Sequence, residues 1–296
     1  MQGAGSAPTE RVLDIIEILS RTDARGMRFS DVVRRLDLSQ GTAHAILTSL
    51  QNRGWVTRDP VSKEFNLGPA LALIASRLDA ERPTAAVARS AIRRLAEKTG
   101  MAASVVERIG EDLVITAFEN PSNSPPPAAL PNDRIPYAPP FGIACAAWDS
   151  VAEQEAWVQR GAAGDASLAE RLRAALAHTR GRGYDVDWMT PALAEAAHAI
   201  GTLSDDSVPG NLRSVVDQLR VEFIATKMLP DESLRGAHSV ATISAPVLDS
   251  NSRVQVILSV HPLRRMTIRE TRTAAEPLLQ EVARVSEERS AHATRS

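Results

Sequence analysis

Apolar residues recur at helical spacing through the first fifty residues of the chain, and this pattern predicts three short helices. Each begins at a residue whose hydroxyl can accept a hydrogen bond from a free backbone N–H: Thr9, Ser30 and Ser39. The apolar stripe of the third helix consists of Ala43, Ile46, Leu47 and Leu50. Its opposite side carries small polar residues, which suit a helix that approaches the base edges of DNA.

The residues after the third helix predict a β-hairpin. Gly54 follows the helix at the position that favours a left-handed backbone, and residues 55–58 and 63–67 have the pattern of two strands around the turn 59–62. Three helices followed by a hairpin are the order of a winged helix-turn-helix, which we assign to residues 9–68. Paired amphipathic helices also occur in other small helical domains, so the flanking helix and the hairpin are what favour a DNA-binding domain.

The rest of the chain predicts a linker and a second domain of mixed structure. Residues 69–83 have the pattern of a linker helix that begins at Pro69 and is ended by Pro83, and residues 84–296 form the second domain. Its predicted elements are a helix up to Gly100, a hairpin over 102–119, a proline-rich loop over 120–140, a helix over 142–149, a helix over 167–182, strands over 240–248 and 253–261, and a last helix that starts with a capping box at Thr267 and Glu270. Residues 1–8 are predicted to be a disordered N-terminus.

Composition and charge narrow the class of protein. With 296 residues and 44% hydrophobic content, the chain is long enough for about two packed domains. Its net charge of −2 excludes a strongly basic coat protein, but residues 25–63 hold seven basic and three acidic side chains. Such a local excess is what phosphate contacts require, although a solvated helix face gives a similar count.

The start of the chain and its cysteine content indicate a cytoplasmic protein. Cys145 is the only cysteine, which rules out an intrachain disulfide and a cysteine-based zinc cluster and fits a reducing compartment. Residues 1–8 have neither the basic region nor the apolar core of a secretion signal, and no apolar run has the length of a membrane helix.

Several segments resemble the IclR-type transcriptional regulators. In the DNA-binding half they are RVLDII at 11–16, LSQGT at 38–42, residues 47–50, RGWV at 53–56 and FNLGP at 65–69. In the other half they are residues 135–137, 142–144, 183–184, 243–249 and 258–260. The resemblance implies an α+β fold, in which an N-terminal winged helix-turn-helix is joined by the linker helix to a GAF-like α/β effector-binding domain. The chain departs from the family at Ala45, where arginine is usual, and in an insert at about 188–235.

The sequence predicts one set of DNA-binding residues and one set of effector-binding residues. The outward side of the third helix and the hairpin give the predicted DNA-binding residues, Ser39, Gln40, Thr42, His44, Thr48, Arg58 and Lys63, with Thr42 and His44 as base contacts. The resemblance implies the effector-binding residues, Tyr137, Gly142, Ile143, Ala144, Asp187, Thr242, Ser259 and His261.

The chemistry of the effector set suits a small acid. Backbone N–H groups near Gly142 together with Thr242, Ser259 and His261 are able to hold a carboxylate. His261 stands where relatives commonly have serine, so we expect a different ligand or a more basic pocket. The competing interpretations are that a single histidine near a strand end only packs, that Asp187 only caps a turn, and that Tyr137 only packs beside the proline loop.

We therefore predict a ligand-responsive transcriptional regulator, a repressor or an activator, that is controlled by a small organic or aromatic acid. Its partners are double-stranded DNA at a pseudo-palindromic operator, the effector and further copies of itself in a homodimer or homotetramer, with no membrane partner. The alternative is a DNA-binding regulator without a small ligand that responds to a partner protein through the insert. A hydrolase using Ser259 and His261 is the rival enzyme class, but the sequence lacks a G-x-S-x-G elbow, a Walker loop, an H-E-x-x-H motif and a G-x-G-x-x-G motif. We expect no catalytic residue, no cofactor and no metal site.

Overall fold

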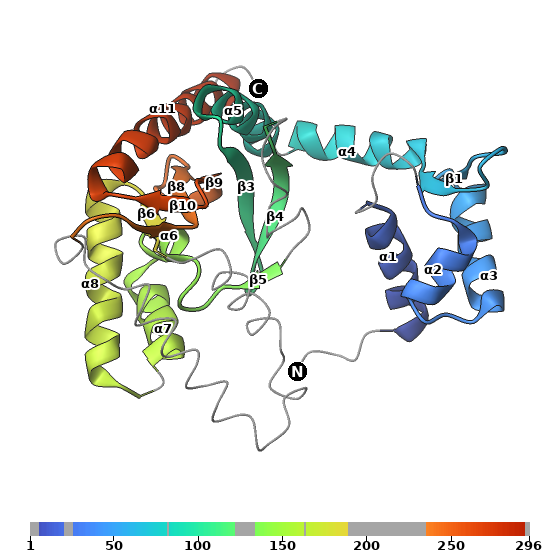
Figure 1. Ribbon diagram of the computed structural model, residues 1–296, viewed down its shortest axis with the longest axis horizontal. Helices are drawn as coiled ribbons and strands as arrows, with labels where there is room; N and C mark the ends of the chain where they lie inside the picture. Colours follow the sequence, from blue (N-terminus) through green and yellow to red (C-terminus); the bar gives the residue numbers. More distant parts are fainter. Residues whose placement is uncertain are drawn as a thin grey trace. The chain divides into compact units, whose positions relative to one another are not determined.

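The computed structural model describes residues 6–20, 26–81, 83–121, 134–162, 164–188 and 235–293 (Figure 1). It divides the chain into two compact units, Met1–Arg82 and Pro83–Ser296. Within the described ranges no helix combines the length and the apolar character that crossing a membrane requires. The insert predicted at about 188–235 lies outside the described residues except for its two ends, as do residues 1–5 of the predicted disordered N-terminus.

The first unit is a winged helix-turn-helix, as the sequence predicts. Its elements are α1 (Ala7–Ser20), α2 (Phe29–Arg35), α3 (Gln40–Asn52), β1 (Val56–Arg58), β2 (Phe65–Leu67) and α4 (Pro69–Glu81). β1 and β2 pair in antiparallel register and form the wing, residues 56–67. The core of the unit consists of Ile15, Leu19, Met27, Val32, Leu47, Leu50, Val56 and Phe65.

A side-chain cap sets the start of one of the first three helices but not of the other two. Ser39 caps α3 as predicted, because its hydroxyl accepts the backbone N–H of Thr42 at 3.1 Å. The caps predicted at Thr9 and Ser30 are wrong, since α1 already begins at Ala7 and α2 at Phe29. The carbonyl of Ser6 accepts the N–H groups of Thr9 and Glu10, so helical hydrogen bonding begins before the threonine.

The second unit is built on a six-stranded antiparallel sheet with the strand order β5-β4-β3-β9-β8-β6. The strands are β3 (Ala102–Ile109), β4 (Asp112–Glu119), β5 (Arg134–Pro136), β6 (Asp185–Asp187), β8 (Thr242–Leu248) and β9 (Val254–His261). A separate pair is formed by β7 (His238–Val240) and β10 (Arg264–Met266). Together with the first unit, this curled sheet and its helices give the α+β, GAF-like architecture that the sequence predicts.

Helices cover both faces of the sheet (Figure 1). On one face lie α5 (Pro83–Thr99) and α11 (Ile268–Ala293), which are joined by an ion pair of 2.7 Å between Arg94 and Glu281. Every second residue of β8 and β9 faces them and is apolar: Ile243, Ala245, Val247, Val256, Leu258 and Val260. On the other face lie α6 (Ile143–Ala146), α7 (Val151–Ala162) and α8 (Ala166–Arg182).

Two predicted elements differ from the structure. The helix predicted over 142–149 is only the four residues of α6, because Ser150 and Glu153 form a second capping box that starts α7. The strand predicted over 240–248 is divided into β7 and β8, which belong to different sheets. In the second unit the strands β5, β6, β7 and β10 have three residues each, too few for a periodic pattern.

Candidate functional site

The predicted DNA-binding residues all lie on α3, at its start or on the wing. Gln40, His44 and Thr48 are exposed and follow one another at a spacing of four, so they form one line along the outer side of α3. His44 also contacts the edge of the Phe29 ring, with 6.5 Å between ring centroids. Thr42 is half-buried, and its hydroxyl lies 2.8 Å from the hydroxyl of Ser39.

The two predicted wing residues are exposed but anchored. The guanidinium of Arg58 lies 5.2 Å from the centre of the Phe65 ring, and its Nε donates to the carbonyl of Lys63 at 3.4 Å. The ammonium of Lys63 donates to the carbonyl of Pro60 at 2.6 Å. Both positive charges are therefore held close to the wing, where they remain open to a phosphate group.

In the second unit, polar side chains form two rows across the sheet, on the face opposite to α5 and α11. The strand register aligns Ser104, Ser259, Ser244 and Asp185 in the first row. The second row contains His261 on β9 next to Thr242 on β8, with Asp187 of β6 paired to Thr242. The hydroxyls of Ser244 and Ser259 are 2.9 Å apart. We call these seven residues the polar rows.

His261 connects the two rows. Its Nε2 lies 2.9 Å from the hydroxyl of Ser104, and its Nδ1 lies 3.3 Å from the hydroxyl of Thr242. Burial lowers the pKa of His261 to about 4, so its imidazole is neutral at pH 7. The neutral imidazole brings no positive charge to the polar rows at pH 7, and the expected difference in ligand stays a prediction.

The structure brings together four of the eight predicted effector residues, namely Asp187, Thr242, Ser259 and His261. It adds four that the sequence did not single out: Ser104, Ser244 and Asp185 of the polar rows, and Phe118, whose ring centroid lies 5.5 Å from that of His261. The signal for Ser104 was present in the sequence, since it is a polar residue inside the apolar run 102–106. Ser104 and Ser259 are buried, whereas Thr242, Ser244, Asp187 and His261 keep partial exposure through which a ligand can reach them.

The other four predicted effector residues belong to an apolar cluster on the same face of the sheet. Tyr137, Ile143 and Ala144 are buried there against Trp157 and Ile257. Gly142 has a φ of +86°, and a Cβ at this residue would lie 2.7 Å from the Tyr137 ring. Glycine is thus required for the close approach of the ring to the backbone. As α6 has only one turn, it gives no independent support for an anion site at Gly142.

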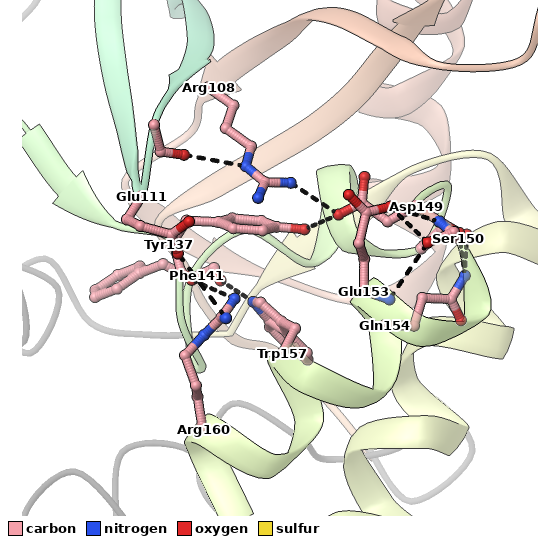
Figure 2. Close-up of polar contacts among 12 residues, drawn as sticks. Arg108, Glu111, Tyr137, Phe141, Asp149, Ser150, Glu153, Gln154, Trp157 and Arg160 are labelled. Atoms are coloured by element: carbon pink, nitrogen blue, oxygen red, sulfur yellow. Dashed lines mark hydrogen bonds and ion pairs between the residues drawn. The ribbon is translucent and has the colours of Figure 1, made fainter.

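Tyr137 is held by charged groups from three parts of the unit (Figure 2). Its hydroxyl donates to Asp149 at 2.5 Å, and the guanidinium of Arg108, on β3, lies 4.0 Å from the ring centre. Arg108 also donates to Asp149 at 3.0 Å, and Arg160 of α7 donates to the Tyr137 carbonyl at 3.2 Å. Burial raises the pKa of Tyr137 and of Asp149 above their ordinary values. This cluster fastens the segment before α6 to the sheet.

Cys145 lies beside this cluster and is a small core residue. It is buried, and burial raises the pKa of its thiol to about 12. The thiol is therefore protonated at neutral pH, which is unsuited to a nucleophile or a metal ligand.

Removing Arg108 should weaken the second unit more than removing an exposed arginine. Arg108→Ala deletes the partner of Asp149, whose side chain is only 15% exposed, and the contact with the Tyr137 ring. We expect a loss of about 1–3 kcal/mol in the free energy of unfolding. The control is Arg173→Ala, which breaks a pair with Glu155 in which both side chains are about half exposed, and its effect on the free energy of unfolding should be clearly smaller. Urea denaturation of the two variants measures the difference, and equal losses would contradict it.

Comparison with known proteins agrees with this architecture. The family model of the IclR helix-turn-helix domain matches residues 8–60. The HTH-type transcriptional regulator XynR of Escherichia coli K12 is 25% identical over 243 residues, which cover 71% of this chain and 92% of XynR.

Solved structures match over nearly the whole chain. An IclR transcriptional regulator from Alicyclobacillus acidocaldarius has a TM-score of 0.59 and 19% identity, covering 96% of this chain and 99% of its own. An IclR homologue from Microbacterium hydrocarbonoxydans, solved in complex with 4-hydroxybenzoate, has a TM-score of 0.58 and 18% identity. The match covers 95% of this chain and 98% of the homologue. At these identities the solved structures establish the likeness of the fold.

Proposed function

Because this chain is an IclR-type DNA-binding transcriptional regulator, we propose that a small organic or aromatic acid controls its binding to a pseudo-palindromic operator. In this proposal residues 9–68 bind the DNA, residues 69–83 connect the two domains, and residues 84–296 bind the effector. Two copies of the chain read the two half-sites, since a two-fold operator mirrors a two-fold protein. In this proposal the protein binds its operator in the cytoplasm.

The observation that carries the effector proposal is the pair of polar rows. Polar groups on a packed face cost free energy unless they are bonded, and the hydroxyls of these rows are bonded to one another or to His261. They therefore keep hydrogen-bonding groups on this face of the sheet at little cost. Thr242 and Ser244 remain partly exposed, and a hydroxyl group is able to donate to a carboxylate. Phe118 beside His261 offers an aromatic surface, and Asp187 can accept a hydrogen bond from a ligand hydroxyl.

A hydroxylated aromatic acid fits these groups, and the 4-hydroxybenzoate bound by the Microbacterium relative makes that compound the first probe. The ligand would act by binding one arrangement of the protein more tightly than another, which changes the population that binds the operator. The second candidate function, a regulator that responds to a partner protein instead of a ligand, depends on the insert at about 188–235.

The test is a fluorescence-anisotropy titration of the full chain with DNA from upstream of its own gene, with scrambled DNA as competitor. Binding that survives the competitor supports operator recognition. The titration is then repeated with 4-hydroxybenzoate and with benzyl alcohol as a control that lacks the carboxylate. A shift of the midpoint by the acid alone supports the effector proposal, whereas a panel of organic acids that changes neither the midpoint nor the melting temperature favours the partner-protein alternative.

A further inference from the structure

His261 has a hydroxyl neighbour at each ring nitrogen, and the two neighbours differ in exposure. Ser104, whose hydroxyl lies 2.9 Å from Nε2, is fully buried, whereas Thr242, whose hydroxyl lies 3.3 Å from Nδ1, is partly exposed. In the described part of the chain neither hydroxyl has a second hydrogen-bond partner. A neutral imidazole carries one N–H group and one bare nitrogen, so it donates to one of these hydroxyls and accepts from the other.

The buried hydroxyl of Ser104 decides which nitrogen of His261 carries the proton. β3 and β9 have a neighbouring strand on each side, so their backbone carbonyls are already bonded within the sheet. With the proton on Nε2, His261 would donate to Ser104, and the Ser104 proton would have no acceptor in the interior, which is costly. With the proton on Nδ1, Ser104 donates to Nε2 and His261 donates to Thr242. Every buried donor of this chain is then bonded.

A second pair of hydroxyls in the polar rows has the same arrangement. Ser259 is buried, Ser244 is partly exposed, and their hydroxyls are 2.9 Å apart. By the same argument the buried Ser259 donates and Ser244 accepts, so the proton of Ser244 is left for another acceptor. Thr242 and Ser244 are two residues apart on β8, which places them on one face with about 7 Å between their Cα atoms.

We propose that His261, with its proton on Nδ1, is a positioning residue that makes the Thr242 hydroxyl a donor to the effector. The proposal rests on the proposed function, in which the polar rows bind a small acid. Because the Thr242 oxygen accepts from Nδ1–H, its own proton remains for a ligand oxygen, and Ser244 supplies a second donor beside it. A carboxylate suits this pair, since it has two accepting oxygens and no proton to donate. His261 thus acts on the ligand through Thr242.

The first test determines the tautomer of His261 without any ligand. A long-range ¹H–¹⁵N correlation spectrum of the full chain, labelled with ¹⁵N-histidine and recorded at pH 7, distinguishes a protonated ring nitrogen from a bare one. The chain has 6 histidines, and the signals that disappear in His261→Gln are those of His261. We expect a protonated Nδ1 and a bare Nε2, a preference that mere packing of the ring does not predict. A proton on Nε2 would overturn the inference, whichever ligand binds.

The second test measures the affinity of the full chain for 4-hydroxybenzoate by calorimetry. Thr242→Val keeps the shape of the side chain but removes its hydroxyl and should weaken binding about tenfold, whereas Thr242→Ser keeps the donor and should bind within about threefold of the wild type. Thr273→Val is the control, because Thr273 is exposed on α11, which covers the other face of the sheet. It should bind like the wild type.

The outcomes separate this inference from the function on which it rests. Wild-type protein that does not bind 4-hydroxybenzoate overturns this acid as the effector and the role of Thr242 toward it, while the spectrum still decides the tautomer. Wild-type protein that binds the acid while Thr242→Val binds it equally well overturns the inference alone. Thermal unfolding of Thr242→Val without ligand should match that of Thr242→Ser, which ensures that the loss of affinity comes from the missing donor.

Discussion

Leu47→Ala is expected to abolish operator binding while the second unit stays folded. Leu47 lies on the inner side of α3, is 2% exposed and joins the third helix to the core of the first unit. Truncating a leucine in such a place costs about 2–5 kcal/mol. A domain of this size has a small margin of stability, so this loss is enough to unfold it. Anisotropy with the operator and two-step thermal unfolding would show the effect.

The control for this prediction is the same substitution at an exposed leucine of the same unit. Leu13 on α1 is 47% exposed, so Leu13→Ala should change the stability by less than about 0.5 kcal/mol and leave DNA binding intact. If both variants bound DNA like the wild type, the role of α3 packing would be refuted. If Leu47→Ala also removed the unfolding transition of the second unit, the two units would not be independent.

His261→Gln should flatten the dependence of stability on pH between about 6.5 and 4. The pKa of His261 is lowered from 6.5 to about 4, so in this range the unfolded chain takes up a proton that the folded chain does not. The wild type therefore loses stability as the pH falls through this window, by at most about 3 kcal/mol. Glutamine cannot be protonated there and can still hydrogen-bond to the hydroxyls of Ser104 and Thr242.

The measurement is urea denaturation of both proteins at several values of pH. Carboxylates also titrate at the acid end, but they are common to the two proteins, so the difference between the curves isolates His261. The difference should grow in favour of the variant as the pH falls below 6.5. Parallel curves would show that the imidazole is already charged in the folded protein or remains in contact with water.

Local chemistry made much of the fold predictable. The cap at Ser39, the left-handed Gly54 and the capping box of Thr267 with Glu270 all depend on neighbours within three residues, and all are present in the structure. The hairpin of β3 and β4 could be predicted for the same reason. Errors arose where two local signals competed, as at Thr9, where the backbone of Ser6 already starts the helix.

The candidate effector site was harder to predict because it depends on strand register. Ser104, Ser244 and Ser259 lie far apart in the sequence and meet only when β3, β9 and β8 are aligned. Ser259 and His261 are two residues apart on β9 and so lie on one face of the sheet, but the burial that lowers the pKa of the imidazole depends on the whole fold. The cluster of Arg108, Tyr137 and Asp149 likewise joins segments whose approach depends on the whole fold.

Along β8 and β9, residues that pack in the apolar core alternate with residues of the polar rows. Residues 243, 245, 258 and 260 face the apolar core, while their neighbours 242, 244, 259 and 261 face the polar rows. If the polar rows bind the proposed effector, a substitution at 242, 244 or 261 changes the chemistry offered to it and leaves the apolar face of the same strands unchanged, whereas Ser259 is itself buried. Under that proposal, a change of effector needs only one substitution at a time, and a laboratory library confined to these codons would test it.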